Sequence, residues 1–213
     1  MNLTFNMLSP VMGIVAAAAL GWVTPAAAET FGNEGIRLDV DTVVEFEFLE
    51  SNGSYQSVFG IVNLQTGEKF PLYGEVKASD VLQTVNTPSD YQDDLGIQNR
   101  DDFQGTPGAT VPQPLGEFSF SADTDYSFYL ESYFRGQSAG TLYSTNSLNP
   151  GNRSYAQFDG PMEQIIDGGL LLRWEDSGSL LVGDANTDYD YDDFIIRVGG
   201  HLRWDEPCGC SRN

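Results

Sequence analysis

Residues 43–49 read VVEFEFL, and this stretch decides what kind of fold the chain can adopt. In it Val44, Phe46 and Phe48 alternate with two glutamates. Successive side chains of a β-strand point to opposite faces, so the alternation predicts a strand with one buried face and one face in water. The stretch is therefore typical of a sheet that covers an apolar core.

A turn signal follows this strand. The dipeptide Asn52-Gly53 is a strong short-range indication of a β-hairpin, and residues 55–64 are predicted as the returning strand, with Gly60 marking a bulge. Residues 70–73 form a further short strand, which we place at a sheet edge because proline cannot donate a ladder hydrogen bond.

The rest of the chain continues this pattern of short strands and turns. The stretch of residues 84–114 is polar, acidic and rich in glycine and proline, which indicates a long loop. We see no long amphipathic helix and no repeat. The predicted fold is an all-β, antiparallel β-sandwich, jelly-roll-like, with one long acidic loop. Further strands are expected at residues 118–120, Tyr126–Phe134, 141–145, 155–158, Leu170–Trp174 and Phe194–Val198, the last two as a centrally buried pair.

The first residues have the parts of a secretory leader. Residues 11–23 are an apolar run too short to span a bilayer, and Pro25 and three alanines follow it. We expect residues 1–28 to be a cleaved signal peptide, residues 29–207 a single β-sandwich domain and residues 208–213 a tail. An uncleaved anchor is the alternative, because no Lys or Arg precedes the apolar run. The protein is thus predicted to be exported, to the extracellular space or the periplasm and cell envelope, with no membrane span after leader removal.

The chain is strongly acidic, with a formal net charge of −21. Such a surface repels phosphate backbones, which argues against nucleic acid as a partner. It suits metal cations or basic partners, and it also suits simple solubility.

Acidic residues concentrate between Leu170–Trp174 and Phe194–Val198. Their mutual repulsion is costly unless a cation neutralises it or water screens it. Carboxylates in this number suit Ca²⁺, which takes six to eight oxygen ligands, better than Mg²⁺. The alternation of Asp188, Asp190 and Asp192 would place these three on one side of an extended segment. A solvated acidic loop without an ion is the alternative. The candidate ligands are Glu175, Asp176, Asp188, Asp190, Asp192 and Asp193.

This part of the chain resembles a known family. RWED at residues 173–176 and DYDYDDFI at residues 188–195 resemble the C-terminal signature of the DUF4114 domain family. Thr187 stands where that family usually has Gly, and Asp192 where it often has Asn. Residues 50–60, 66–69 and 142–146 are similar to the longer form in exported cyanobacterial proteins. The resemblance implies a secreted β-sandwich with a calcium site, often beside adhesion or matrix modules, and no known reaction.

These features lead to one main hypothesis of function and two alternatives. We expect a secreted, non-catalytic, calcium-binding protein with an adhesion, extracellular-matrix or cell-envelope role, whose partner is a cell-surface or matrix component such as a polysaccharide. The first alternative is a carbohydrate-binding module with a structural calcium ion, in which Tyr91, Tyr133 and Tyr155 would stack on sugars. The second is a hydrolase that uses a pair of carboxylates. His201 is the single histidine, so a Ser-His-Asp or Cys-His site would have to use this residue.

Overall fold

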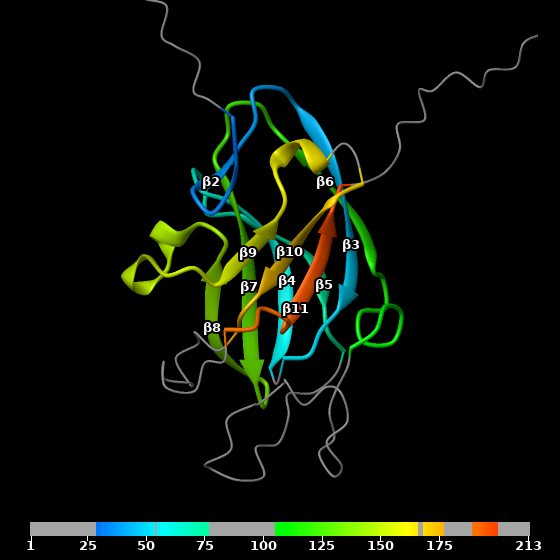
Figure 1. Ribbon diagram of the computed structural model, residues 1–213. Coiled ribbons are helices and arrows are strands. Elements are labelled where there is room, and N and C mark those ends of the chain that lie inside the picture. The colour runs from blue at the N-terminus through cyan, green and yellow to red at the C-terminus, as the bar shows by residue number, and fades with distance from the viewer. Residues whose placement is uncertain (1–28, 54, 77–104, 166–167, 177–188, 200–213) are drawn as a thin grey trace, which may run out of the picture.

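The protein folds as two antiparallel β-sheets packed face to face (Figure 1). The computed structural model describes residues 29–53, 55–76, 105–165, 168–176 and 189–199. Within these ranges the regular structure consists of strands and a few short 3-10 helices. The prediction of an all-β antiparallel sandwich is confirmed.

The first sheet has the strand order β1-β2-β7-β4-β5, and β8 also pairs with β7. Its strands are β1 (Thr30–Gly32), β2 (Gly35–Arg37), β4 (Gln56–Asn63), β5 (Lys69–Gly74), β7 (Tyr126–Phe134) and β8 (Gln137–Tyr143). The predicted edge strand is β5, and a register shift between Phe59 and Gly60 confirms the bulge.

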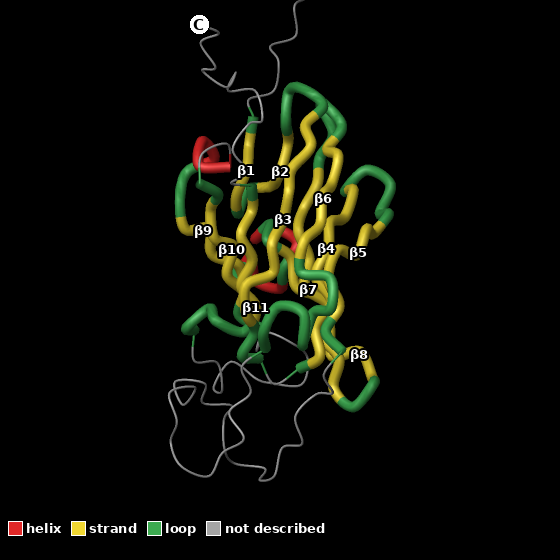
Figure 2. The backbone as a smooth tube through the Cα atoms, turned by 90° about the vertical axis from the view of Figure 1, so that its right-hand side faces the viewer, coloured by secondary structure: helices red, strands yellow, loops and turns green. Residues whose placement is uncertain are grey.

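The second sheet has the order β6-β3-β11-β10-β9. Its strands are β3 (Thr42–Glu50), β6 (Leu115–Phe120), β9 (Ala156–Asp159), β10 (Leu170–Trp174) and β11 (Phe194–Val198). The bounds of β10 and β11 are those expected from the sequence, and β11 lies in the centre of the sheet. The 3-10 helices are η2 (Asn146–Leu148), η3 (Pro150–Asn152) and η4 (Met162–Ile165). Figure 2 shows that the strands run along the long axis of the molecule and that most loops lie at its two ends.

The core between the sheets is built largely from aromatic rings. Val44, Phe46 and Phe48 of β3 are buried, as their alternation with glutamate predicted. Phe128 of β7 is fully buried and lies at the centre of the ring contacts. Rings from both sheets lie with their centroids 5.6 to 6.5 Å from that of Phe128: Phe31, Phe46, Phe59, Phe120 and Phe158. Each such ring buries a large apolar area, so hydrophobic burial stabilises this part of the molecule.

The predicted hairpin at Asn52-Gly53 is wrong. β3 belongs to the second sheet and β4 to the first, so the turn carries the chain from one sheet to the other. A two-residue type I′ hairpin needs positive φ at both central residues, and neither Asn52 nor Gly53 has one. The backbone N–H groups of both residues instead donate to the carbonyl of Asp193, each over 3.2 Å. Hydrogen bonds to a distant segment have therefore replaced the local hairpin ladder.

Several sequence predictions lie outside the described residues. They are the leader at 1–28, the tail at 208–213, Tyr91, His201, Asp188 and residues 84–104 of the long loop. Residues 105–114 of that loop are described, and Gly105 exchanges backbone hydrogen bonds with Ser51. No helix among the described residues is both long and apolar enough to cross a membrane.

Candidate metal centre

Three strand ends bring the acidic residues together at one end of the sandwich. Trp174 at the end of β10 pairs with Phe194 at the start of β11, so the residues after Trp174 lie beside those before Phe194. β3 is the other neighbour of β11, and the turn that follows β3 contacts Asp193. Figure 1 shows the β3–β4 connection and the start of β11 at the same end of the molecule. The second sheet thus positions two carboxylate-bearing segments and one turn side by side.

The carboxylates next to the strand ends are buried. Glu175, Asp176 and Asp193 expose 0%, 3% and 5% of their surface. The Asp176 backbone N–H donates to Asp193 Oδ2 over 2.6 Å, which ties the beginning of β11 to the end of β10. Moving carboxylates out of water is costly unless they are hydrogen-bonded, paired or bound to a metal. Three carboxyl groups are therefore held close to the ends of β10 and β11 with little access to water.

Residues 189–192 lead from the exposed Tyr189 to the buried Asp193 and do not form a strand. Tyr189 and Tyr191 have φ values of 58° and 59°, in the left-handed region that residues with a side chain rarely adopt. The expected extended segment with alternating aspartates and tyrosines is therefore wrong here. Asp190 Oδ1 accepts a hydrogen bond from the Asp192 N–H over 3.3 Å, so this stretch is a compact turn. Left-handed non-glycine residues are common at binding sites, where surrounding contacts hold the strained backbone.

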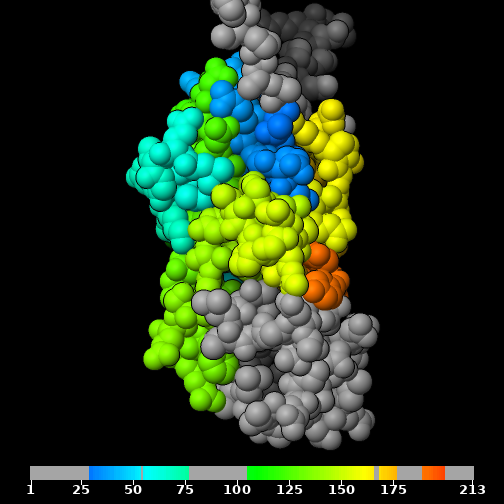
Figure 3. All heavy atoms as spheres, turned by 90° about the vertical axis from the view of Figure 1, so that its left-hand side faces the viewer, coloured from blue at the N-terminus to red at the C-terminus, as the bar shows by residue number. Residues whose placement is uncertain are grey.

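Tyr191 fastens this turn to the neighbouring segment. Its hydroxyl donates to the Ser154 carbonyl over 3.2 Å. Figure 3 shows that part of the orange segment, residues 189–199, reaches the surface next to the yellow-green residues before β9. Burial and then the negative charge of Glu175 raise the pKa of Tyr191 above its usual value. Tyr191 therefore stays neutral and bonded at physiological pH.

The sequence did not identify three residues at this end of the molecule. Asn52, 5% exposed, donates from Nδ2 to the Asp192 carbonyl over 3.3 Å. Glu75 is equally buried, and it accepts hydrogen bonds from the Ser51 hydroxyl and from the Ser57 N–H. Gly53 lies so close that an added Cβ would be 2.6 Å from Asp176 Oδ2. The Asn-Gly pair was visible in the sequence, but it was read as a local turn rather than as part of the acidic site.

The described residues fit an oxygen-liganded cation in their chemistry, although they do not form a complete coordination shell. Asp190 Oδ2 and Asn52 Oδ1 are buried oxygens that accept no hydrogen bond from the residues that the structure describes. Ca²⁺ takes carboxylate and amide oxygens, which are the donors present. Among the described residues, no group of three or more acidic, histidine or cysteine side chains is arranged to hold a metal ion. Of the six predicted ligands, Glu175, Asp176, Asp190, Asp192 and Asp193 lie at this end of the sandwich, and Asp188 lies outside the described residues.

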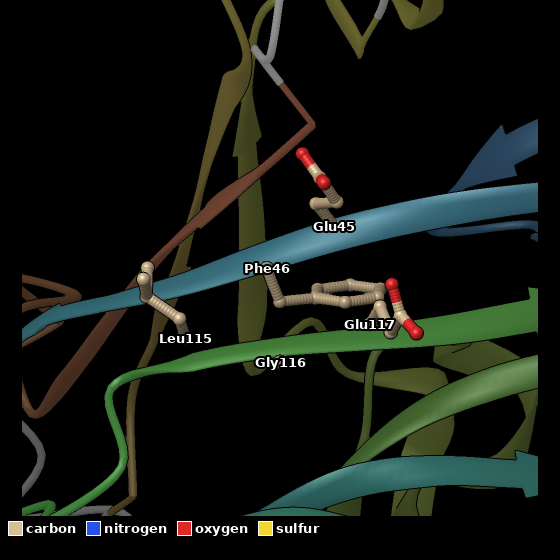
Figure 4. A pocket seen from close by; sticks show the side chains of 5 residues that line it. All are labelled: Glu45, Phe46, Leu115, Gly116 and Glu117. Atoms are coloured by element: carbon tan, nitrogen blue, oxygen red, sulfur yellow. The ribbon is translucent and has the colours of Figure 1, made fainter.

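A separate groove lies on β3 and β6 of the second sheet (Figure 4). It measures about 260 Å³ and is lined by Glu45, Phe46, Leu115, Gly116 and Glu117. Glu45 and Glu117 are direct cross-strand partners, so two carboxylates stand close together at its rim. Glu117 is exposed and Glu45 half-buried, so water screens this pair far more than the carboxylates beside β10.

The tyrosines proposed for sugar stacking are not arranged as one surface. Tyr155 is 4% exposed and packs in the core, so it presents no face to a sugar. Tyr133 of β7 is half-buried. Of the three tyrosines proposed to stack on sugars, Tyr133 is the one described residue whose ring is partly accessible.

No model of a known protein family, no curated protein and no solved structure matches this chain. The resemblance to the DUF4114 family stays a prediction from the sequence.

Proposed function

We propose that the protein is an exported, non-catalytic, calcium-binding β-sandwich that serves adhesion, the extracellular matrix or the cell envelope. One observation carries the calcium assignment: Glu175, Asp176 and Asp193 are buried, and Oδ2 of Asp190, three residues before Asp193, is a buried oxygen that accepts no hydrogen bond from the described residues. Buried carboxylates in such number are typical of a site for a hard divalent cation. The apolar run and small residues at 11–28 support export.

The residues proposed to hold the ion come from both sides of the β10–β11 connection. Glu175 and Asp176 follow β10, and Asp190, Asp192 and Asp193 precede β11. A bound cation would offset their repulsion and add a link across the open end of the second sheet. Folding and calcium binding would then be thermodynamically linked, because the ligands converge only in the folded chain.

Thermal unfolding of the purified protein in EDTA, in Ca²⁺ and in Mg²⁺ tests this proposal. Calcium at about 100 times its dissociation constant should stabilise the fold by about 2.7 kcal/mol. The double variant Asp190→Asn/Asp193→Asn should lose this increase, because it removes two charges while keeping side chains of similar shape. No calcium-dependent shift in the unmodified protein would refute the calcium assignment.

The matched control removes the same charge elsewhere. Glu34 and Glu68 are exposed on the turns of the first sheet. The variant Glu34→Gln/Glu68→Gln should keep the full calcium response, because it changes the net charge equally and leaves the site intact. An equal loss in both double variants would mean that calcium acts on the overall charge of the protein.

The second candidate function is a hydrolase that uses a pair of carboxylates, because two glutamates, Glu45 and Glu117, line the groove on β3 and β6. Its volume of about 260 Å³ is slightly below the range usual for ligand pockets, about 300–1,000 Å³. Release of reducing sugar from soluble polysaccharides, abolished by Glu117→Gln, would favour this function over a structural role. Calcium-dependent retention of the protein in a polysaccharide gel without hydrolysis would instead favour the carbohydrate-binding module.

A further inference from the structure

We propose that the Asn52–Gly53 turn is the third wall of the calcium site and that Asn52 Oδ1 is one of its ligand oxygens. This inference rests on the function proposed above and adds to it a residue from a third element. The sequence separates Asn52 from Asp193 by the greater part of the domain, and the sheet order brings them together. The turn follows β3, which is the direct neighbour of β11.

The first argument is the hydrogen bonding of the Asn52 amide. Nδ2 donates to the Asp192 carbonyl, and the backbone N–H donates to the Asp193 carbonyl. These two bonds fix the amide against the acidic turn. Oδ1 of the same amide is buried and accepts no hydrogen bond from the described residues.

The orientation of this amide is determined by its surroundings. Exchanging the positions of Oδ1 and Nδ2 would place two acceptor oxygens, Oδ1 and the Asp192 carbonyl, against each other. The bonded arrangement is therefore the favourable one. A buried amide oxygen without a donor is uncommon, and it needs a water molecule or a cation to complete its environment.

The second argument is the contact at Gly53. A Cβ added there would lie 2.6 Å from Asp176 Oδ2 and 3.2 Å from Asp193 Cβ. The φ of Gly53 is not positive, so glycine is required by this close approach rather than by backbone conformation. The backbone of the turn thus lies directly against the Asp176 carboxylate, at van der Waals distance from the proposed ligands.

The two substitutions Asn52→Ala and Asn52→Asp separate a ligand role from a packing role. Alanine removes both the amide donor and the oxygen, while aspartate removes the donor and keeps an oxygen. If Asn52 Oδ1 is a ligand, Asn52→Ala should weaken calcium binding at least about tenfold. This is the lower end of the loss of metal affinity that follows substitution of residues around a metal site. A ligand role also predicts that Asn52→Asp binds at least as tightly as the unmodified protein, because a carboxylate is the stronger calcium ligand.

Isothermal titration of the full chain with CaCl₂, after removal of divalent ions, measures these affinities. Asn146→Ala is the matched control, because Asn146 Oδ1 is also buried and accepts no hydrogen bond from the described residues, but Asn146 lies on η2, outside the segments that carry the proposed ligands. This control should bind calcium like the unmodified protein. An unmodified protein that does not bind calcium overturns the proposed function itself.

Two other results overturn the role of Asn52 while leaving the calcium function in place. One is unchanged affinity in Asn52→Ala. The other is an Asn52→Asp variant as weak as Asn52→Ala, which would show that the amide acts only as a donor to Asp192. If Asn52→Ala does not fold, the near-isosteric Asn52→Asp still decides between the two roles, through the size of its calcium-induced rise in melting temperature.

Discussion

The middle of the sandwich and its acidic end are held together by different forces. Around Phe128 the two sheets exclude water with apolar rings, and stability there follows the buried area. Around Asp193 the same second sheet ends in buried carboxylates and backbone hydrogen bonds from a turn. The middle of the sandwich is apolar and one end of the second sheet carries buried carboxylates, so we expect the two regions to respond differently to charge and to cations. The predictions that follow probe this difference.

The largest effect is expected in the core. Phe128→Ala should lower the free energy of unfolding by about 3–5 kcal/mol, since it leaves a cavity among five aromatic rings. The loss should be the same in EDTA and in Ca²⁺, because Phe128 lies in β7 of the first sheet, whereas the proposed ligands flank β10 and β11 of the second. Urea unfolding under both conditions measures it.

The control for this core substitution is Leu115→Ala, at a side chain that is exposed. Its effect should stay within about 0.5 kcal/mol. A loss for Phe128→Ala that depends on calcium would show that the core and the acidic end are coupled.

The next effect concerns the bond between β10 and β11. Asp193→Ala removes the acceptor of the Asp176 N–H and should cost about 1.5–3 kcal/mol, as expected for a hydrogen bond to a charged group. Asp193→Asn keeps an acceptor oxygen and should cost less. Hydrogen exchange at the Asp176 amide measures this directly. Equal protection of that amide in all three proteins would contradict the assigned bond.

A third prediction tests the close approach of the turn. Gly53→Ala should destabilise the protein by about 1–3 kcal/mol, because its Cβ would overlap Asp176 Oδ2 and displace that carboxylate. Calcium affinity should fall with it, if Asp176 is a ligand. Gly32→Ala is the control, since a Cβ there meets no atom within 4 Å. Similar melting temperatures for the two variants would show that the turn moves aside freely.

The smallest expected effect is a loss of stability at alkaline pH that comes from Tyr129 and does not depend on the acidic end. Burial, with a contribution from Glu131, raises the pKa of Tyr129 to about 12. The phenol of an unfolded chain ionises near pH 10, so the unfolded state loses its proton first. The stability contributed by the neutral Tyr129 should therefore be complete below about pH 10 and be lost as the pH rises to about 12.

Urea unfolding at pH 9 and pH 11 in EDTA measures this alkaline loss. Tyr129→Phe should reduce the difference between the two pH values, because it removes the ionisable hydroxyl at this buried position. Calcium should not change that reduction, since Tyr129 lies in β7 of the first sheet. An unaltered difference in Tyr129→Phe would assign the alkaline loss to other groups, such as Tyr73, whose pKa burial also raises.

Much of the fold could be predicted because strand patterns are local. The alternation around Phe46 and the apolar runs at β10 and β11 record which side of each strand is buried. Side-chain direction has a period of two in any strand, so no knowledge of distant residues is needed. For the same reason the sequence indicated that acidic residues flank the connection between the last two strands. Their burial was not predictable, because it depends on what packs over them.

Local patterns in the sequence specified most of the strands and the acidic segment between β10 and β11, but they did not indicate β1 and β2, and they placed β8 at residues 141–145 instead of Gln137–Tyr143. Long-range packing places β3 and β4 in opposite sheets and brings Asn52 and Gly53 against Asp193 and Asp176. The physical reason is that alternation specifies the buried face of a strand but not the sheet that it joins. That choice depends on contacts between residues far apart in the chain, and here those contacts turned a hairpin signal into part of the candidate metal centre.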